Sequence, residues 1–178
     1  MIILGLDFSY SKSGYSVSKI DLSNGNIKLI DCGLLISPKD LEFIERIDSH
    51  INDIYKVIKK HKPDLVVKEA AIMGRSSTGL NVIKSHGVLE YECFNNLTPL
   101  EEVHNQTIKA WARKQLIENN LYTKETIKSI DKKLVVAEAI ESYYDCTIEE
   151  IRTPRGRLLD DVADGIAIPI VYYEKNLK

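Results

Sequence analysis

The stretch LGLDFSYSKSGYSV, residues 4–17, puts one carboxylate, Asp7, directly after an apolar run that is typical of a buried strand. A small, polar and basic turn follows, and the alternating residues 14–20 predict a second strand. Three interpretations explain an acid in this place: an ordinary turn residue, part of a phosphate-binding loop, or the first ligand of a metal site. Only the rest of the chain can distinguish them.

Length and composition describe an ordinary globular chain. Its 178 residues predict a single domain, residues 1–178, and the apolar fraction of 44% and charged fraction of 28% are typical of globular proteins. The chain contains no apolar stretch of about 18 residues and no basic region before the first strand, so we expect neither a membrane span nor a signal peptide. The net charge of −2 means that a nucleic-acid partner would have to be bound by local basic patches.

The three cysteines, Cys32, Cys93 and Cys146, are far apart and lack C-x-x-C spacing. A zinc site or a disulfide framework is therefore not expected, and a reducing cytoplasm fits this usage.

Hydrophobic periodicity and turn signals predict an α/β fold. Strands are expected at 2–7, 14–20, 27–36, 65–69 and 99–103, and helices at 38–60, 80–94, 105–118, 129–143 and from Asp160 or Asp161 onward. The stretch GRSSTG, residues 74–79, is expected to be a loop, and residues 152–157 a basic linker. This order resembles the layout of a ribonuclease-H-like domain, a mixed five-stranded sheet of three antiparallel strands and then parallel strands, flanked by helices.

Four carboxylates stand out in this layout. Asp7 and Glu69 end predicted strands, and their spacing places Asp161 and Asp164 on one face of the last helix. If the first and fourth strands are neighbours, Asp7 and Glu69 emerge side by side at the edge where open α/β sheets bind ligands. The last helix can then bring its two acids opposite them.

Converging carboxylates repel one another unless cations neutralise them. Oxygen ligands suit Mg²⁺ or Mn²⁺, and two such ions would activate a water and stabilise the leaving oxygen in an attack on a phosphodiester. The sequence therefore predicts a site for phosphodiester hydrolysis.

Each acid also has an ordinary structural interpretation. Asp7 could accept backbone N–H bonds in a turn, Glu69 could be a solvated strand end, and either Asp160 or Asp161 could cap the last helix. Asp164 is harder to explain in this way, because it lies inside an otherwise apolar stretch of small residues.

Four segments together resemble the RuvC-type Holliday-junction resolvases of the ribonuclease-H-like superfamily, particularly small phage-borne members. They are IILGLDFSYSKSGYSV (2–17), KPDLVVKEAAIM (62–73), SHGVLEYECF (85–94) and DDVADGIAI (160–168). The resemblance implies a crossover junction endodeoxyribonuclease whose metal ligands are Asp7, Glu69, Asp161 and Asp164, with Asp161 preferred to Asp160 because it keeps the family's D-x-x-D spacing.

The same resemblance implies partners and a reaction. Family members are homodimers that bind four-way DNA junctions and introduce paired, symmetric nicks with Mg²⁺, for which Mn²⁺ can substitute, using two ions per site. A role in DNA recombination and repair in a bacterial cell follows, with the protein encoded either by the cell or by a phage. Bacterial members carry an aromatic residue soon after the second acid, where this chain has Ile72 and Met73. That departure implies cleavage of several kinds of branched DNA.

Local basic and polar residues are candidates for DNA binding, although lysines on helices are usually just a solvated face. The candidates are Arg75 and Ser76 in the loop, Lys109, Lys132 and Lys133 on or before helices, and Arg155 and Arg157 in the linker. The segment GVLEYECF, residues 87–94, is either a dimer interface or an internal packing face, and the resemblance favours the dimer.

Three other functions compete with the junction nuclease. A related nuclease that cuts RNA–DNA hybrids, flaps or forks would use the same acids. A nucleotide-binding module of the actin and sugar-kinase type also begins with a strand and an acid, but it needs a second lobe for which this chain is too short. A catalytically inert binding domain would not need all four acids.

Overall fold

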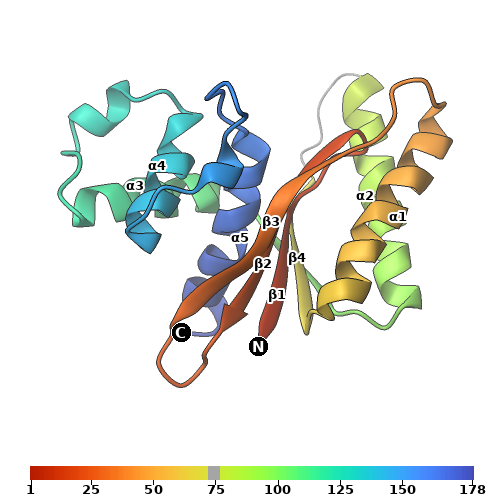
Figure 1. Cartoon of the computed structure of the whole chain (residues 1–178), viewed down its shortest axis with the longest axis horizontal. Coiled ribbons are helices and arrows are strands. Elements are labelled where there is room, and N and C mark those ends of the chain that lie inside the picture. The colour runs from red at the N-terminus through yellow and green to blue at the C-terminus, as the bar shows by residue number, and fades with distance from the viewer. Residues whose placement is uncertain (72–76) are drawn as a thin grey trace.

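The computed structural model describes residues 1–71 and 77–178, and these contain one five-stranded sheet (Figure 1). The strands are β1 (Ile2–Asp7), β2 (Lys12–Ile20), β3 (Ile27–Ile36), β4 (Leu65–Glu69) and β5 (Leu100–Val103), in the order β3-β2-β1-β4-β5. The first three pair antiparallel, whereas β1 with β4 and β4 with β5 pair parallel. The mixed sheet predicted from the sequence is confirmed.

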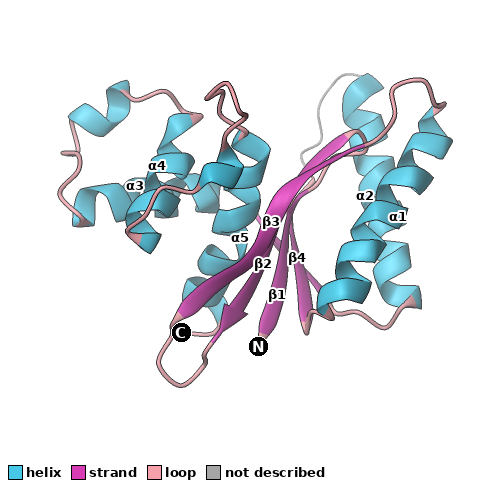
Figure 2. Cartoon of the chain, in the orientation of Figure 1, coloured by secondary structure: helices cyan, strands magenta, loops and turns pink. Residues whose placement is uncertain are grey.

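Among the described residues, five α-helices cover the two faces of the sheet (Figure 2). They are α1 (Phe43–His61), α2 (Ser77–Asn95), α3 (Asn105–Glu118), α4 (Leu134–Tyr144) and α5 (Asp160–Asn176), with short 3₁₀ turns at Thr126–Ser129 and Glu149–Ile151. Helices α1 and α2 lie on one face, and α5, backed by α3 and α4, lies on the other.

Alternation along the strands supplies a core to each face. Ile3 and Val67 pack into the cluster around α5, whereas their neighbours Leu4 and Val66 pack under α1 and α2. Because both faces are covered, β1 is apolar up to Asp7 and β4 begins with the apolar run Leu65–Val67. Each strand ends at a carboxylate, and this is the feature that places the candidate site.

Helix α5 approaches the sheet closely because small residues line the contact. A Cβ at Gly14 would lie 1.8 Å from the carbonyl oxygen of Asp161, so only glycine fits there. Pro169 lies inside α5 and has no N–H for the carbonyl of Gly165, and the hydroxyl of Ser16 donates to that carbonyl at 2.8 Å instead. The sheet therefore holds the first two turns of α5, which carry Asp161 and Asp164, in a defined position.

Two predicted helices begin later than expected. Helix α1 begins at Phe43 rather than at residue 38, because Glu42 and Glu45 form a reciprocal capping box at its start. Helix α4 begins at Leu134 rather than at residue 129. The Asp131 carboxylate accepts the N–H of Lys133 at 2.9 Å, and its carbonyl accepts the N–H of Leu134 at 2.9 Å, which favours a turn before the helix.

Two further boundaries differ. The predicted loop 74–79 is wrong for residues 77–79, which form the first turn of α2, because short polar residues favour helix starts as well as loops. The remainder of that loop lies outside the described residues. The second strand begins at Lys12, two residues before the predicted start.

Candidate active site

Three of the four predicted acids meet at one edge of the sheet. Asp7 ends β1, Glu69 ends the parallel neighbour β4, and Asp164 comes from the second turn of α5. One carboxylate oxygen from each lies within 4.8 Å of the other two. The parallel pairing explains why two acids separated by 62 positions in the sequence emerge together.

The electrostatics of this cluster favour protonated carboxyls when no cation is present. Burial raises the pKa of Asp7 well above its usual value, and the charges of Glu69 and Asp164 raise it further. The pKa of Asp164 is raised to about 7, first by burial and then by Glu69. Burial also raises the pKa of Glu69, although hydrogen bonds and a nearby lysine act in the opposite direction.

The donor set fits a hard divalent cation. Three crowded, partly buried carboxylates offer only oxygen ligands, which are the ligands that Mg²⁺ and Mn²⁺ prefer. A cation between them would neutralise the mutual repulsion that adds to burial in raising the pKa values of Asp7 and Asp164.

Asp161 does not belong to this three-acid cluster. It forms an ion pair with Lys12, the first residue of β2, although its charge still raises the pKa values of Asp7 and Asp164. Asp160 pairs instead with Lys133, whose Nζ lies 2.8 Å from the carboxylate. The first turn of α5 thus presents two acids that are each neutralised by a lysine.

Helix α3 contributes two side chains to the acids. Asn105, its first residue, donates from Nδ2 to Oε2 of Glu69 at 2.9 Å. Lys109 lies one turn later, and its positive charge lowers the pKa values of Glu69 and Asp164 relative to burial alone. The sequence indicated Lys109 as a candidate for DNA binding, whereas Asn105 was only the first residue of the predicted helix 105–118. The signal for Asn105 was its position directly beyond β5, at the same edge as the acids.

A buried polar network supports Glu69 from the opposite face of the sheet. The neighbouring Lys68 is fully buried under α2, where its ammonium forms ion pairs with Glu102 and, at 3.1 Å, with Glu90. It also contacts Nδ1 of His86 at 3.1 Å, and burial lowers the pKa of His86 to about 4. This network joins α2 to the strand that carries Glu69, and nothing in the residue pattern pointed to a buried lysine.

The other predicted DNA-binding residues lie in separate surface regions. Lys132 lies in a shallow basic hollow with Arg113, and Arg157 lines a groove beside the first turn of α5. Arg155 is exposed in the turn before that helix. Arg75 and Ser76 lie outside the described residues, as do Ile72 and Met73.

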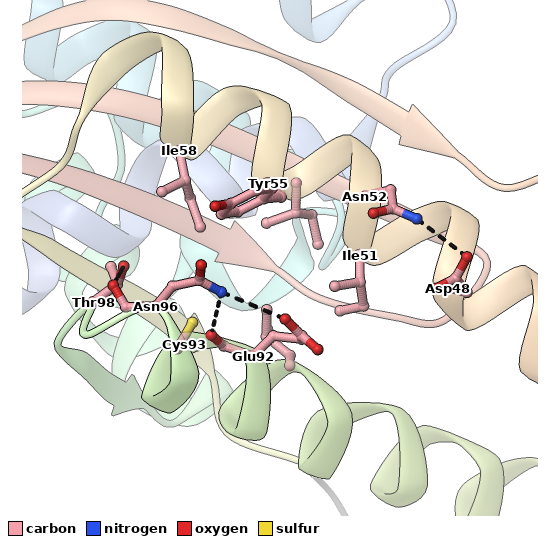
Figure 3. A pocket seen from close by; sticks show the side chains of 11 residues that line it. Asp48, Ile51, Asn52, Tyr55, Ile58, Glu92, Cys93, Asn96 and Thr98 are labelled. Atoms are coloured by element: carbon pink, nitrogen blue, oxygen red, sulfur yellow. Dashed lines mark hydrogen bonds between the residues drawn. The ribbon is translucent and has the colours of Figure 1, made fainter.

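A separate cavity of about 190 Å³ lies between α1 and α2 (Figure 3). Its rim carries two short-range hydrogen bonds, Asn52 to Asp48 and Asn96 to Glu92. Burial raises the pKa of the Cys93 thiol there to about 11, so the thiol is not a nucleophile at neutral pH. The cavity lies on the face opposite α5, away from the carboxylate cluster.

Comparisons with known proteins agree with this geometry. A family model described as "Crossover junction endodeoxyribonuclease RuvC" matches residues 3–147, which include Asp7 and Glu69, whereas α5 lies beyond them. The RuvC proteins of Prochlorococcus marinus strain MIT 9313 and Parasynechococcus marenigrum strain WH8102 are 32% and 30% identical over 109 residues. These residues are 61% of this chain and 70% of each relative.

Solved structures share the fold at low sequence identity. Thermus thermophilus RuvC, in a complex with a Holliday junction substrate, aligns with a TM-score of 0.73 and 15% identity over 99% of this chain and 98% of that chain. A yeast mitochondrial Holliday junction resolvase aligns with a TM-score of 0.59 and 12% identity over 96% of this chain and 78% of that chain. Because the family model spans most of the sequence, this chain belongs to the RuvC family of crossover junction endodeoxyribonucleases.

Proposed function

We propose that this chain is a structure-selective endonuclease that resolves Holliday junctions, and accepts other branched DNA, by metal-dependent phosphodiester hydrolysis. One observation carries the proposal: in a chain of the RuvC family, Asp7, Glu69 and Asp164 come together at the carboxyl edge of the sheet. The relatives carry the name crossover junction endodeoxyribonuclease, and one structure of the same fold contains a Holliday junction.

The proposed cofactor is Mg²⁺, with two ions per site and with Mn²⁺ as a substitute. Asp7, Glu69 and Asp164 would hold the ions, and Asp161 would join them after exchanging its ion pair with Lys12. When bound, the ions supply the Lewis acidity that activates water and stabilises the leaving oxygen of an in-line hydrolysis.

The side chains around the acids have roles of their own. Asn105 fixes one oxygen of Glu69 by donating a hydrogen bond, which leaves the other oxygen available to a cation. Lys109 faces the acids and can donate to a phosphate oxygen next to the cleaved bond. Lys132, Lys133, Arg155 and Arg157, together with Arg75 and Ser76, are proposed to contact the DNA backbone.

We also propose that the protein acts as a homodimer, which is what paired nicks require. Helix α2 exposes apolar side chains along one face: Leu80 is 53% exposed, Tyr91 62% and Phe94 76%. A Cβ added to Gly87 on the same helix would have no neighbour within 4 Å, so internal packing does not explain this glycine. A second copy packed against α2 would cover the stripe.

Two further expectations follow from the same proposal. Helix α5 contacts all five strands, which supports residues 1–178 as one nuclease domain. The three cysteines are free, which supports action in the cytoplasm of a bacterial cell. No helix among the described residues is both long and apolar enough to cross a bilayer.

A nicking assay tests the proposal. Wild-type protein with Mg²⁺ is incubated with a synthetic four-way junction, a linear duplex, a flap and an RNA–DNA hybrid of matched sequence. The expected result is paired, symmetric nicks in the junction that are lost in Asp7→Asn. Preferential cutting of the hybrid or the flap would favour the related nuclease instead. Cutting that persists in Asp7→Asn would refute the assigned site.

A further inference from the structure

A groove beside the first turn of α5 gathers positive charge that the carboxylate site does not use. Its volume is about 390 Å³, and it is lined by Lys12, Lys39, Arg46 and Arg157 together with the hydroxyls of Ser37 and Thr153. The residues come from β2, from the segment between β3 and α1, from α1 itself, and from the turn before α5. Segments that are distant in the sequence therefore converge on one basic surface.

Arg46 is held in a fixed orientation at this groove. Its Nε donates to Oγ of Ser37 at 3.3 Å, and its guanidinium lies over the ring of Tyr10, 5.2 Å from the centroid. Tyr10 is itself packed edge-on against Phe43, with ring centroids 5.4 Å apart. These contacts orient the guanidinium and leave its terminal amino groups available to an acceptor.

The groove carries an excess of positive charge. Within the described ranges, no carboxylate lies within ion-pair distance of Lys39, Arg46 or Arg157. Asp160 is the one acid among the lining residues, and its carboxylate is already paired with Lys133. Three unpaired cations around one hollow, one of them oriented by its neighbours, form a site for an anion with several oxygen acceptors.

The groove is continuous with the carboxylate site. Lys12 lines the groove and pairs with Asp161, which is one helical turn before Asp164 of the cluster. A strand whose cleaved bond lies at the cluster can therefore extend across Lys12 into the groove.

We propose that this groove binds a backbone phosphate of the DNA strand that is cut, a few nucleotides from the cleaved bond, with Arg46 and Lys39 as its principal ligands. The inference rests on the proposed function, because it assumes that DNA lies at the carboxylate cluster. Binding of this kind reads no base, so it contributes affinity and register for every sequence and every branched substrate.

The test measures DNA affinity and its salt dependence in an Asp7→Asn background with EDTA, using a fluorescent four-way junction. Arg46→Gln and Lys39→Gln are each compared with Lys59→Gln. Lys59 is a matched control because it lies over a tyrosine ring on the same helix, 4.5 Å from the centroid, at the end away from the groove. Thermal melting establishes that each variant is folded.

Each groove variant should bind about fivefold to tenfold more weakly near 0.1 M salt, and the slope of log K against log salt should fall by about 0.9. Lys59→Gln should match the parent. A neutral methylphosphonate placed singly along the cut strand gives a second readout. At one position it should weaken binding by the parent and cause a smaller loss in Arg46→Gln, where Lys39 is the remaining principal ligand of that phosphate.

The inference is wrong if both groove variants keep the DNA affinity and the salt slope of the parent. It is also wrong if the effect of the methylphosphonate adds fully to that of Arg46→Gln at every position. These results are separable from a failure of the proposed function. That failure appears as absent junction nicking by the wild-type chain, whatever the groove variants do. If the wild-type chain nicks junctions while the variants bind like Lys59→Gln, the groove assignment alone is wrong.

Discussion

At the scale of single residues, the main question is how repelling carboxylates are held together. Asp7, Glu69 and Asp164 are attached to strand ends and a helix that the core fixes in place, so they cannot separate to relieve their repulsion. Burial raises the pKa values of all three acids, and the neighbouring charges add to this at Asp7, whose pKa is raised well above its usual value, and at Asp164, whose pKa rises to about 7. This has a direct consequence for stability in the absence of metal.

The pKa of Asp164 is about 7 in the folded state and keeps its ordinary value in the unfolded chain. At a pH between these two pKa values, the folded state therefore holds a proton on Asp164 that the unfolded state has lost. This contribution to stability is fully present below the unfolded pKa and disappears as the pH rises through about 7. At pH 8 in EDTA, the free energy of unfolding of Asp164→Asn should therefore be about 1–3 kcal/mol higher than that of wild type. At acidic pH the two free energies of unfolding should differ little. Urea unfolding at pH 4 and pH 8 measures both values, and equal pH dependence in the two proteins would contradict the account.

Asn105 provides a second test at this scale. Asn105→Ala removes the hydrogen bond that orients Glu69, and we expect nicking about tenfold slower, as for other residues that orient metal ligands. Asn105→Asp should be slower still, because it adds a negative charge beside the acids. Single-turnover nicking across a Mg²⁺ titration measures the effect, which should appear partly as a higher Mg²⁺ requirement. Unchanged rates and Mg²⁺ requirement in Asn105→Ala would exclude this role.

The acids were predictable from the sequence, whereas several of their neighbours were not. Asp7 follows an apolar run directly and Glu69 follows one after Lys68, and an acid that ends a buried strand is recognisable from the order of residues alone. The pairing of Asp161 with Lys12 depends on side-chain conformations that no periodic pattern encodes. Arg46 has no distinguishing motif, because its importance comes from Tyr10 and a groove formed by distant segments.

At the scale of elements, the succession of strands and helices along the chain followed from patterning, whereas the helix starts did not. A strand covered on one face of the sheet alternates apolar and polar residues, whereas a strand covered on both faces is mostly apolar. Both patterns can be recognised in the sequence. The starts of α1 and α4 depend on local hydrogen bonds, namely the capping box of Glu42 and Glu45 and the turn around Asp131. Such bonds are specified by individual side chains rather than by a repeat, so the predicted boundaries moved by several residues.

The contact between α5 and the sheet gives a prediction at this scale. Gly14→Ala would place a Cβ 1.8 Å from the Asp161 carbonyl oxygen, so α5 would have to move away from β2. We expect a loss of about 2–4 kcal/mol of stability and loss of nicking, as for overpacked cores. Gly33→Ala is the control, since its Cβ would meet only the side chain of Tyr15, at 3.1 Å, and it should cost less than about 1 kcal/mol. Chemical unfolding of both variants measures the difference, and a neutral Gly14→Ala would mean that α5 does not lie so close to the sheet.

At the scale of the whole molecule, the two faces of the sheet have separate tasks. The α5 face carries the carboxylates, and the basic groove opens beside it. The opposite face carries the cavity between α1 and α2 and, beyond it, the exposed apolar stripe of α2. A dimer formed through α2 would therefore leave both active sites open to DNA.

The dimer is tested by changing one exposed side chain. Phe94→Glu places a charge in the proposed interface and should convert the protein to a monomer, with single nicks replacing paired nicks. Leu22→Glu is the control, because Leu22 is similarly exposed, at 59%, but lies in the turn between β2 and β3. Light scattering after gel filtration measures the mass. A wild-type protein that is monomeric at all concentrations, or a dimer that survives Phe94→Glu, would exclude this interface.

The central claim is that Asp7, Glu69 and Asp164 share divalent cations, and direct measurement of Mn²⁺ binding by calorimetry or electron paramagnetic resonance tests it most simply. The measurement compares wild type with Asp164→Asn and with Asp48→Asn, which alters an acid of the cavity between α1 and α2. We predict saturable Mn²⁺ binding to wild type and to Asp48→Asn, together with proton release near neutral pH, and loss of that binding in Asp164→Asn. Equal Mn²⁺ binding by all three proteins would contradict the claim.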